Sequence, residues 1–260
     1  MISITSAQID VWIAAFIFPL ARILGFIAAA PIWGSAGIPR RVRLVAGIAI
    51  TFAIAPTLPP MPDVQPASWS GLWILIQQIL IGIGMGFAAK IVFAALDMTG
   101  EFIAFQMGLG FATSYDPLSS SQTPVVGEFL SLVALTLFLS LNGHLIYFAT
   151  LAQSFSAIPV SAIPLTPTSW LNLAELGSKI FSIGILLALP VVVSIMITNV
   201  ALAVLTRAAP QLNIFALGFP LTLLGGFFGL AIIMTYLATP LQDLYELAIN
   251  AILGFAIVGG

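Results

Sequence analysis

Side chains that could carry chemistry are few and widely spaced in this chain. It has 7 Lys and Arg, 9 Asp and Glu, 1 His and no Cys in 260 residues. Without cysteine there is no disulfide, no thiolate metal site and no thiol nucleophile. The single histidine, His144, has no neighbouring Cys or His, so it does not form a convincing metal site. No Ser–Lys, Asp–Asp or His–Glu–His constellation and no P-loop stands out, and the sequence predicts no enzyme, no metal and no cofactor.

The remaining ionisable residues each allow two interpretations. Asp97 and Glu101 are four apart and share a helix face, where they either form part of an acidic ring, couple to protons, or face water. His144 is either a proton switch or a hydrogen-bonded packing histidine. Arg22 lies inside an apolar segment, where a lone charge costs roughly 2.5–3.5 kcal/mol. It either contacts another subunit or a substrate path, or pairs within the chain with a carboxylate such as Asp97, Glu101 or Glu128.

Composition defines the class of protein. The chain is 60% hydrophobic and 6% charged, against roughly 25% charged in soluble domains. It is therefore expected to be a polytopic membrane protein or a deeply buried subunit of a large assembly. The net charge of -2 and the scattered basic residues do not favour nucleic acid as a partner.

Apolar segments of nearly the length of a membrane span, about 20 residues, recur along the chain. We expect six of them, near residues 11–32, 43–58, 72–96, 129–151, 180–205 and 214–237, with a mildly amphipathic helix from 241. No Gly/Ser tract divides the chain, so one domain over residues 1–260 is predicted. The expected fold class is all-α, with membrane-associated helical hairpins. If all six segments cross, Arg40, Arg41, Arg43 and Arg207 lie on one side, which the positive-inside rule places in the cytoplasm.

The third connection, near residues 100–125, is an interrupted segment. It is too apolar for a solvent loop, and Gly108, Gly110 and Pro117 interrupt it too often for an ordinary span. Such segments survive at membrane depth only when protein buries them or they line a cavity. Bulky apolar side chains on a backbone that glycines allow to bend could block a pore and withdraw. The alternative is a re-entrant packing loop with no gating role.

A second unusual stretch, residues 206–220, lies between two apolar segments. It places a charge, two prolines and two amides beside segments that otherwise suit hydrocarbon. A subunit contact or a helix cap fits these residues better than a substrate site. Small residues at helical spacing, Gly82, Gly84 and Gly86 and then Gly225, Gly226 and Gly229, would let helix backbones approach closely, either within the chain or between chains.

Several runs of the sequence, in this order, resemble the FliR family of flagellar export-gate proteins and its injectisome counterparts. They cover nearly the whole chain, at residues 30–33 with 38–43, 55–59, 77–87, 100–117, 142–145, 187–190 and 207–223. No single run is decisive, but their joint order is specific. The run Gly-Phe-Pro-Leu-Thr-Leu-Leu-Gly at 218–225 is more typical of the flagellar branch.

The resemblance implies a subunit of the type III export gate in the bacterial inner membrane, within the flagellar basal body. Family members assemble with multiple copies of FliP and FliQ and contact FlhB, in a helical cone whose channel passes unfolded proteins. In this family the region that matches residues 102–124 forms a plug in the closed channel. The alternatives are an injectisome export-gate subunit and, in a different class, an ion-coupled secondary transporter in which Arg22, Lys90 and His144 bind substrate or protons.

Two sets of candidate site residues follow. The plug candidates are Phe102, Phe105, Met107, Gly108, Leu109, Gly110, Phe111, Tyr115, Asp116 and Pro117. The candidates for subunit contacts or structural roles are Arg22, Pro39, Arg40, Arg207, Pro210, Gln211, Asn213 and Pro220.

Overall fold

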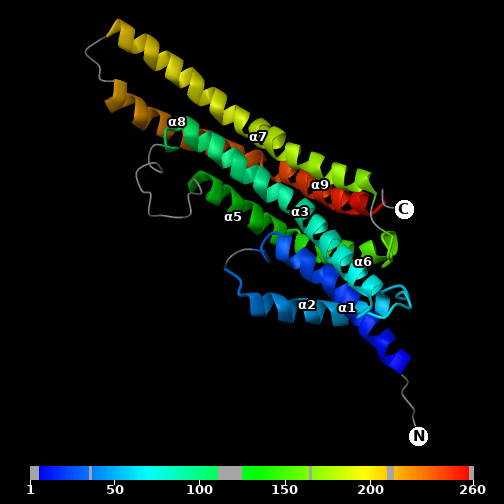
Figure 1. The fold of residues 1–260 in the computed structure, drawn as a ribbon. Helices are drawn as coiled ribbons and strands as arrows, with labels where there is room; N and C mark the ends of the chain where they lie inside the picture. Colours follow the sequence, from blue (N-terminus) through cyan, green and yellow to red (C-terminus); the bar gives the residue numbers. More distant parts are fainter. Residues whose placement is uncertain (1–5, 35–36, 111–124, 164–165, 210–213, 258–260) are drawn as a thin grey trace. The chain divides into compact units, whose positions relative to one another are not determined.

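Helices make up the secondary structure of the described part of the chain. The computed structural model describes residues 6–34, 37–110, 125–163, 166–209 and 214–257. In chain order the elements are α1 (Ser6–Ala29), α2 (Arg40–Ile54), the 3-10 turn η1 (Ala55–Thr57), α3 (Trp69–Gln106), α5 (Val125–Ser140), α6 (Gly143–Ala157), α7 (Pro167–Ala208), α8 (Ile214–Tyr236) and α9 (Ala238–Ile257) (Figure 1). The predicted all-α fold class is confirmed.

These helices belong to two compact units, each built from separate stretches of the chain. The first unit contains residues 1–91, 142–176 and 245–260, and the second contains residues 92–141 and 177–244. Helices α3, α7 and α9 contribute residues to both units. The single domain over residues 1–260 stays a prediction.

Fewer helices of the described chain qualify as candidate membrane spans than the six expected. Four helices of the described chain are long and apolar enough to cross a membrane, namely α1 (from Gln8), α3, α7 and α8 (from Leu217). A fifth span is possible only if α5 and α6 act together. Helix α2 has 15 residues and is about 22 Å long, which is shorter than the roughly 30 Å hydrocarbon core. The predicted cytoplasmic placement of Arg40, Arg41, Arg43 and Arg207 assumed six crossings and is therefore not supported by this count.

A sharp bend divides the segment that was expected to form the fourth span. Helices α5 and α6 differ in direction by 70°. Asn142, between them, has a φ of 56°, in the left-handed region that Asn adopts more readily than most residues. The Asn-Gly pair at 142–143 therefore ends one helix and begins another where apolar composition alone suggests a continuous one.

Helices α3 and α7 are longer than the apolar segments that predicted them. They contain 38 and 42 residues, or about 57 and 63 Å at 1.5 Å per residue. Pro167 is the first residue of α7, where its missing N–H costs no hydrogen bond.

Glycines bring α1 and α3 into backbone contact in the first unit. A Cβ on Gly82 would lie 2.8 Å from the backbone nitrogen of Phe26, and one on Gly25 would lie 2.5 Å from the carbonyl oxygen of Ile79. Figure 1 shows α1 and α3 side by side, with their first residues at the same end. The close approach predicted for Gly82 is confirmed, and it occurs within the chain.

In the second unit, glycines likewise allow α3 to pack closely on α5 and α7. A Cβ on Gly100 would collide with the backbone of Gly127 in α5, and one on Gly184 of α7 would lie 2.9 Å from the Cβ of Met98. Thr99 Oγ1 donates a hydrogen bond of 3.2 Å to the carbonyl oxygen of Gly184. The terminal part of α3 is thus fixed by neighbours before the interrupted segment begins.

Candidate functional site

Helix α3 ends in a Schellman motif at the start of the interrupted segment. Leu109 N–H donates to the carbonyl oxygen of Ala104 at 2.9 Å, and Gly108 N–H donates to that of Phe105 at 3.1 Å. Gly108 has a φ of 80°, which is left-handed and strained for any residue with a Cβ. The backbone therefore turns away from the helix axis at Gly108.

From the sequence, the bend was expected at Gly108 and Gly110. The structure places it at Gly108. Gly110 follows the turn, and a Cβ there would lie 2.7 Å from a ring carbon of Phe105. Since that ring is 63% exposed, it has room to move. Contact with the Phe105 ring therefore limits substitution of Gly110, whereas the left-handed backbone limits substitution of Gly108.

Met107 anchors this turn on α8. Its side chain is fully buried and lies against Gly226, where a Cβ would come within 2.5 Å of the sulfur. Thr222 Oγ1, also on α8, lies 3.5 Å from the Met107 carbonyl oxygen and makes a weak hydrogen bond to it. A Cβ on Gly108 would meet the ring of Phe219 at 3.4 Å. Three successive turns of α8 thus hold the first residues of the interrupted segment.

The bulky apolar residues of the plug candidate differ in exposure. Met107 is buried, Phe102 and Leu109 are half-buried, and Phe105 is 63% exposed. Phe105 therefore presents an apolar ring outward from the anchored end of α3. The other plug candidates, Phe111, Tyr115, Asp116 and Pro117, lie outside the described residues.

The acidic pair Asp97 and Glu101 lies on α3 just before this turn. Asp97 is exposed and accepts a hydrogen bond from the hydroxyl of Ser131 on α5. Glu101 is half-buried. Among the described residues no group of three or more His, Cys, Asp or Glu could hold a metal ion. The arrangement of Asp97 fits the water-facing interpretation better than a shared acidic site.

Arg22 occupies a fully buried position in the first unit. Its Nε donates to Gln78 Oε1 at 2.7 Å, its Nη1 to the carbonyl oxygen of Ser154 at 2.9 Å, and its Nη2 to that of Ile158 at 2.8 Å. The guanidinium also lies 4.1 Å from the ring centre of Phe155. In place of the expected carboxylate, carbonyl groups at the C-terminal end of α6 hold the charge, where the helix dipole is negative.

The surroundings of Arg22 bear on its expected role. A side chain with no exposed surface in this chain is poorly placed to contact another subunit or a substrate path. Its hydrogen bonds join α1, α3 and α6, so it acts as a cross-brace between three helices. Sequence reasoning missed Gln78, Ser154 and Ile158, since no local signal connects positions 56 to 136 residues apart.

The remaining candidates lie on the surface or outside the described residues. Pro39 precedes α2 and Arg40 begins it, and both are exposed. Arg207 is exposed in the last turn of α7, where a cation suits the helix dipole. Pro220 lies inside α8 and does not end it. The candidates Pro210, Gln211 and Asn213 lie outside the described residues.

His144 lies in the first turn of α6, next to the bend between α5 and α6. Its Nδ1 is buried and has no hydrogen-bond partner among the described residues. The hydrogen bond that the packing interpretation requires is therefore not made by this nitrogen.

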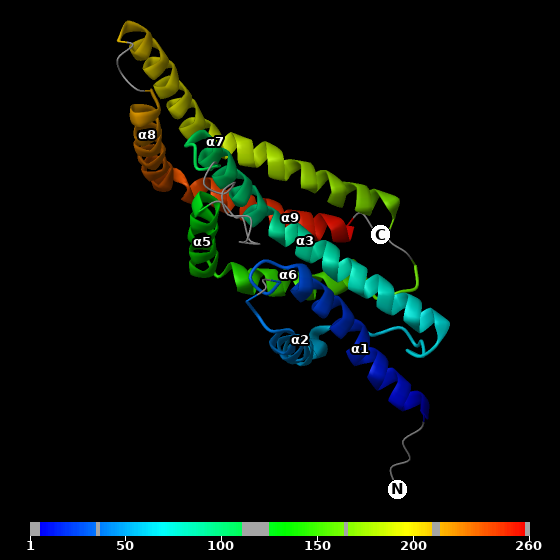
Figure 2. The ribbon, with the colours of Figure 1, turned by 60° about the vertical axis from the view of Figure 1, so that its left-hand side comes forward.

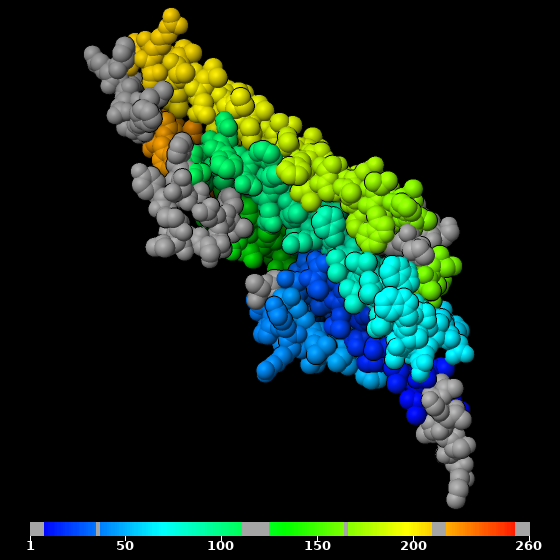
Figure 3. Space-filling model, in the orientation of Figure 1, coloured from blue at the N-terminus to red at the C-terminus, as the bar shows by residue number. Residues whose placement is uncertain are grey.

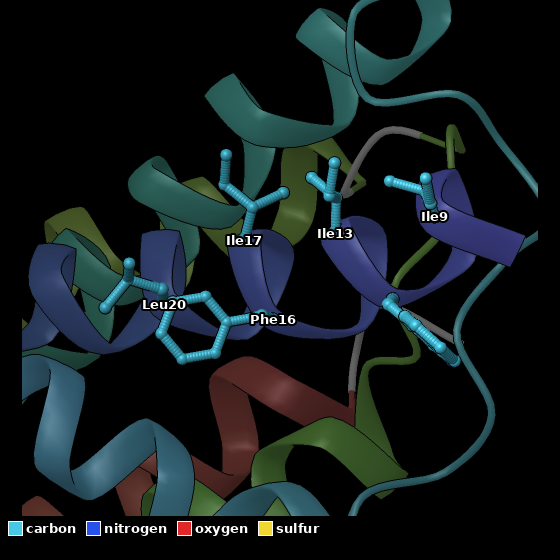
Figure 4. A pocket seen from close by; sticks show the side chains of 6 residues that line it. Ile9, Ile13, Phe16, Ile17 and Leu20 are labelled. Carbon is cyan, nitrogen blue, oxygen red and sulfur yellow. The ribbon is translucent and has the colours of Figure 1, made fainter. Parts of the chain in front are cut away.

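A shallow apolar groove lies along α1. It has a volume of about 380 Å³ and is lined by Ile9, Trp12, Ile13, Phe16, Ile17 and Leu20. Figure 4 shows Ile9, Ile13 and Ile17 in a row along one side of the helix. With apolar residues only, the groove has no group that could orient a polar substrate or take part in acid–base chemistry.

Comparison with known proteins finds similar sequences over nearly the whole chain. The family model described as bacterial export proteins, family 1, matches residues 13–248. The flagellar biosynthetic protein FliR of Escherichia coli (strain K12) is 42% identical over 96% of this chain and 95% of its own length. That of Pectobacterium carotovorum is 40% identical over 95% and 94%, and that of Bacillus subtilis is 28% identical over 94% and 96%.

Proposed function

Because the chain belongs to family 1 of the bacterial export proteins, we propose that it helps to form and seal the channel through which flagellar proteins leave the cell. It is a subunit of the flagellar export apparatus, and its apolar helices make it a membrane protein of that apparatus. The relatives named above are all flagellar. This favours the proposal over an injectisome subunit and over an ion-coupled transporter.

The anchored turn at the end of α3 is the observation that supports a sealing role. Met107 is buried against Gly226, while Phe105, two residues earlier, is 63% exposed. A seal needs a fixed base that resists displacement and an apolar surface that excludes ions. Apolar constrictions stop ions because an ion passing one gives up its hydration without replacement. The residues from Phe102 to Gly110 have both properties.

The proposed mechanism is passive. In the closed state the interrupted segment blocks the channel with apolar side chains, among them Phe102, Phe105 and Phe111. Contact with a partner subunit or an arriving substrate displaces the part of the segment that follows Gly108, whose left-handed backbone already turns the chain out of α3, while Phe102 and Phe105 stay with the fixed base. The chain itself carries out no chemical step, and the energy for transport enters through other components.

Partners and location follow from the same proposal. The chain assembles with several copies of FliP and FliQ, contacts FlhB, and lies in the inner membrane within the flagellar basal body. Helices α7 and α8 support this, because in each only 22% of the most apolar window is buried within the chain. Exposed side chains such as Phe181, Val200 and Phe227 need either lipid or apolar helices of other subunits around them.

Co-expression with FliP and FliQ, followed by native mass spectrometry of the purified material, tests the assembly. We expect a discrete hetero-oligomer that contains this chain as a minor subunit. A monomer or homodimer that forms in the presence of both partners would contradict the proposal. In that case Arg22 and His144 would be tested for substrate or proton binding.

A further inference from the structure

Helix α2 carries a surface that the proposed channel function leaves unexplained. With 15 residues it is about 22 Å long, too short to cross the roughly 30 Å hydrocarbon core by itself. It is also absent from the candidate spans of the described chain. A helix of this length in a membrane protein either packs inside the protein or lies at the membrane surface.

One face of α2 packs on α1. Gly47 and Thr51 are buried on it, and a Cβ on Gly47 would lie 2.5 Å from a methyl carbon of Leu24. Thr51 Oγ1 donates to the carbonyl oxygen of Gly47 at 2.7 Å, so its hydroxyl is satisfied. This face joins α2 to the rest of the first unit.

The opposite face is apolar and open. Val42, Val45 and Phe52 are 50%, 65% and 66% exposed. Their spacing of three and seven residues places them on one stripe of a helix. The ring of Phe52, at the edge of this face, also lies 4.8 Å from the ring of Phe16 on α1. Figure 3 shows α2, in blue, at the surface of the first unit.

Positive charge gathers at the first turn of the same helix. Arg40 and Arg41 are exposed and Arg43 is half-buried, and no acidic residue occurs in the first turn. In the whole stretch from residue 11 to 62 there is no Asp or Glu. The N-terminal end of a helix dipole is also positive, so these positive side chains are unfavourable there unless an anion lies nearby.

Helix α2 lies beside α1 in the first unit (Figure 2). Since α1 is long and apolar enough to cross the bilayer, the open face of α2 lies next to a candidate membrane span.

We propose that α2 is a membrane-surface helix that binds anionic lipid. Val42, Val45 and Phe52 enter the boundary of the acyl chains, and Arg40 and Arg41 lie among the phosphate headgroups. An apolar stripe that begins at a cluster of arginines is the pattern that such helices show. The proposal does not depend on the channel function.

The first test uses the natural absence of cysteine. Val45→Cys and Phe52→Cys are labelled singly with a nitroxide in the full chain, which is reconstituted in vesicles of phosphatidylcholine and phosphatidylglycerol. Label depth is measured from collisions with oxygen and with a polar nickel complex. The matched controls are Ile197→Cys and Val204→Cys on the candidate span α7, which are both 65% exposed and also seven residues apart.

A surface helix places both α2 labels at the same shallow depth, whereas the α7 labels differ by about 10 Å if α7 crosses the membrane. A depth difference on α2 equal to that on α7 would overturn the proposal in favour of a crossing helix. Protection of both α2 labels from oxygen and nickel would overturn it in favour of a protein cover.

The second test addresses lipid charge. The double variant R40Q/R41Q is compared with K90Q/K179Q, which removes two exposed positive charges elsewhere. We expect the preference of the chain for phosphatidylglycerol over phosphatidylcholine, measured by native mass spectrometry, to fall about five-fold per arginine in the first variant. No loss in R40Q/R41Q, or an equal loss in both variants, would contradict a site at α2.

Discussion

Met107, at the end of α3, fills the space beside Gly226 of α8 that a Cβ would require. Its side chain has no exposed surface, and three of its atoms would lie closer than 3 Å to a Cβ on Gly226. This contact joins the start of the interrupted segment to a helix more than a hundred residues later in the chain. The position of the proposed seal therefore depends on α8 as much as on α3.

Substitution of Gly226 by Ala tests this contact. We expect the added methyl group to push Met107 out of place, at a cost of about 1–3 kcal/mol, as is usual for overpacking. Thermal unfolding of the purified chain measures the loss of stability. Gly225→Ala is the matched control, because the nearest atom to a Cβ there is Thr198 Oγ1 at 4.0 Å. Equal stability of the two variants would show that Met107 is not fixed by Gly226.

Gly108→Ala tests the turn that ends α3. A Cβ at a φ of 80° costs about 1–2 kcal/mol, so this variant should unfold at a lower temperature. Gly218→Ala is the control, and we expect it to raise the stability of the chain. It lies in α8 with open space around a Cβ, where replacing a helical Gly by Ala stabilises by roughly 0.5–1 kcal/mol. A Gly108→Ala variant as stable as the wild type would place the bend elsewhere.

Gly108 and Gly226 show what sequence can and cannot predict about the site. A glycine at the end of a long apolar helix indicates a turn, and Gly108 is that turn. The partner of Met107 could not be predicted, because a glycine on a distant helix carries no sign of which side chain it accommodates. Phe111, Tyr115, Asp116 and Pro117 lie outside the described residues, and their role stays a prediction.

The fold was predictable where hydropathy and helix length agree. Segments near 11–32, 72–96, 180–205 and 214–237 correspond to α1, α3, α7 and α8. The segments near 43–58 and 129–151 do not form single straight spans, for different reasons. The first is too short as a helix, and the second bends at Asn142, whose left-handed backbone hydropathy does not detect.

Arg22 should be essential for folding of the first unit. Arg22→Leu leaves Gln78 and the carbonyl groups of Ser154 and Ile158 without a donor. We expect a loss of roughly 3 kcal/mol or more, measured by thermal unfolding in detergent or as a fall in yield. Arg22→Lys keeps the charge with fewer donors and should fall in between. Arg207→Leu, at an exposed position, should have little effect, and equal effects of the two Leu substitutions would contradict the cross-brace.

Arg207→Ala should weaken assembly and leave the chain folded. Arg207 is exposed in the last turn of α7, where loss of a cation costs at most about 1 kcal/mol of helix stability. We expect an unchanged melting temperature and less FliP and FliQ in the purified complex. Normal complex yield together with lost secretion would assign Arg207 to transport instead of assembly.

The most direct measurement of the sealing role is ion flux across vesicles that contain the purified complex with FliP and FliQ. We would compare the wild type with Phe105→Ala and Phe111→Ala, and with Phe181→Ala as a control for loss of an exposed phenyl ring on α7, where Phe181 is 56% exposed. Complex composition is checked by native mass spectrometry. The account predicts tight vesicles for the wild type and Phe181→Ala, and a clear ion leak for Phe105→Ala and Phe111→Ala. Equally tight vesicles for all four proteins would contradict it and make the interrupted segment a packing loop.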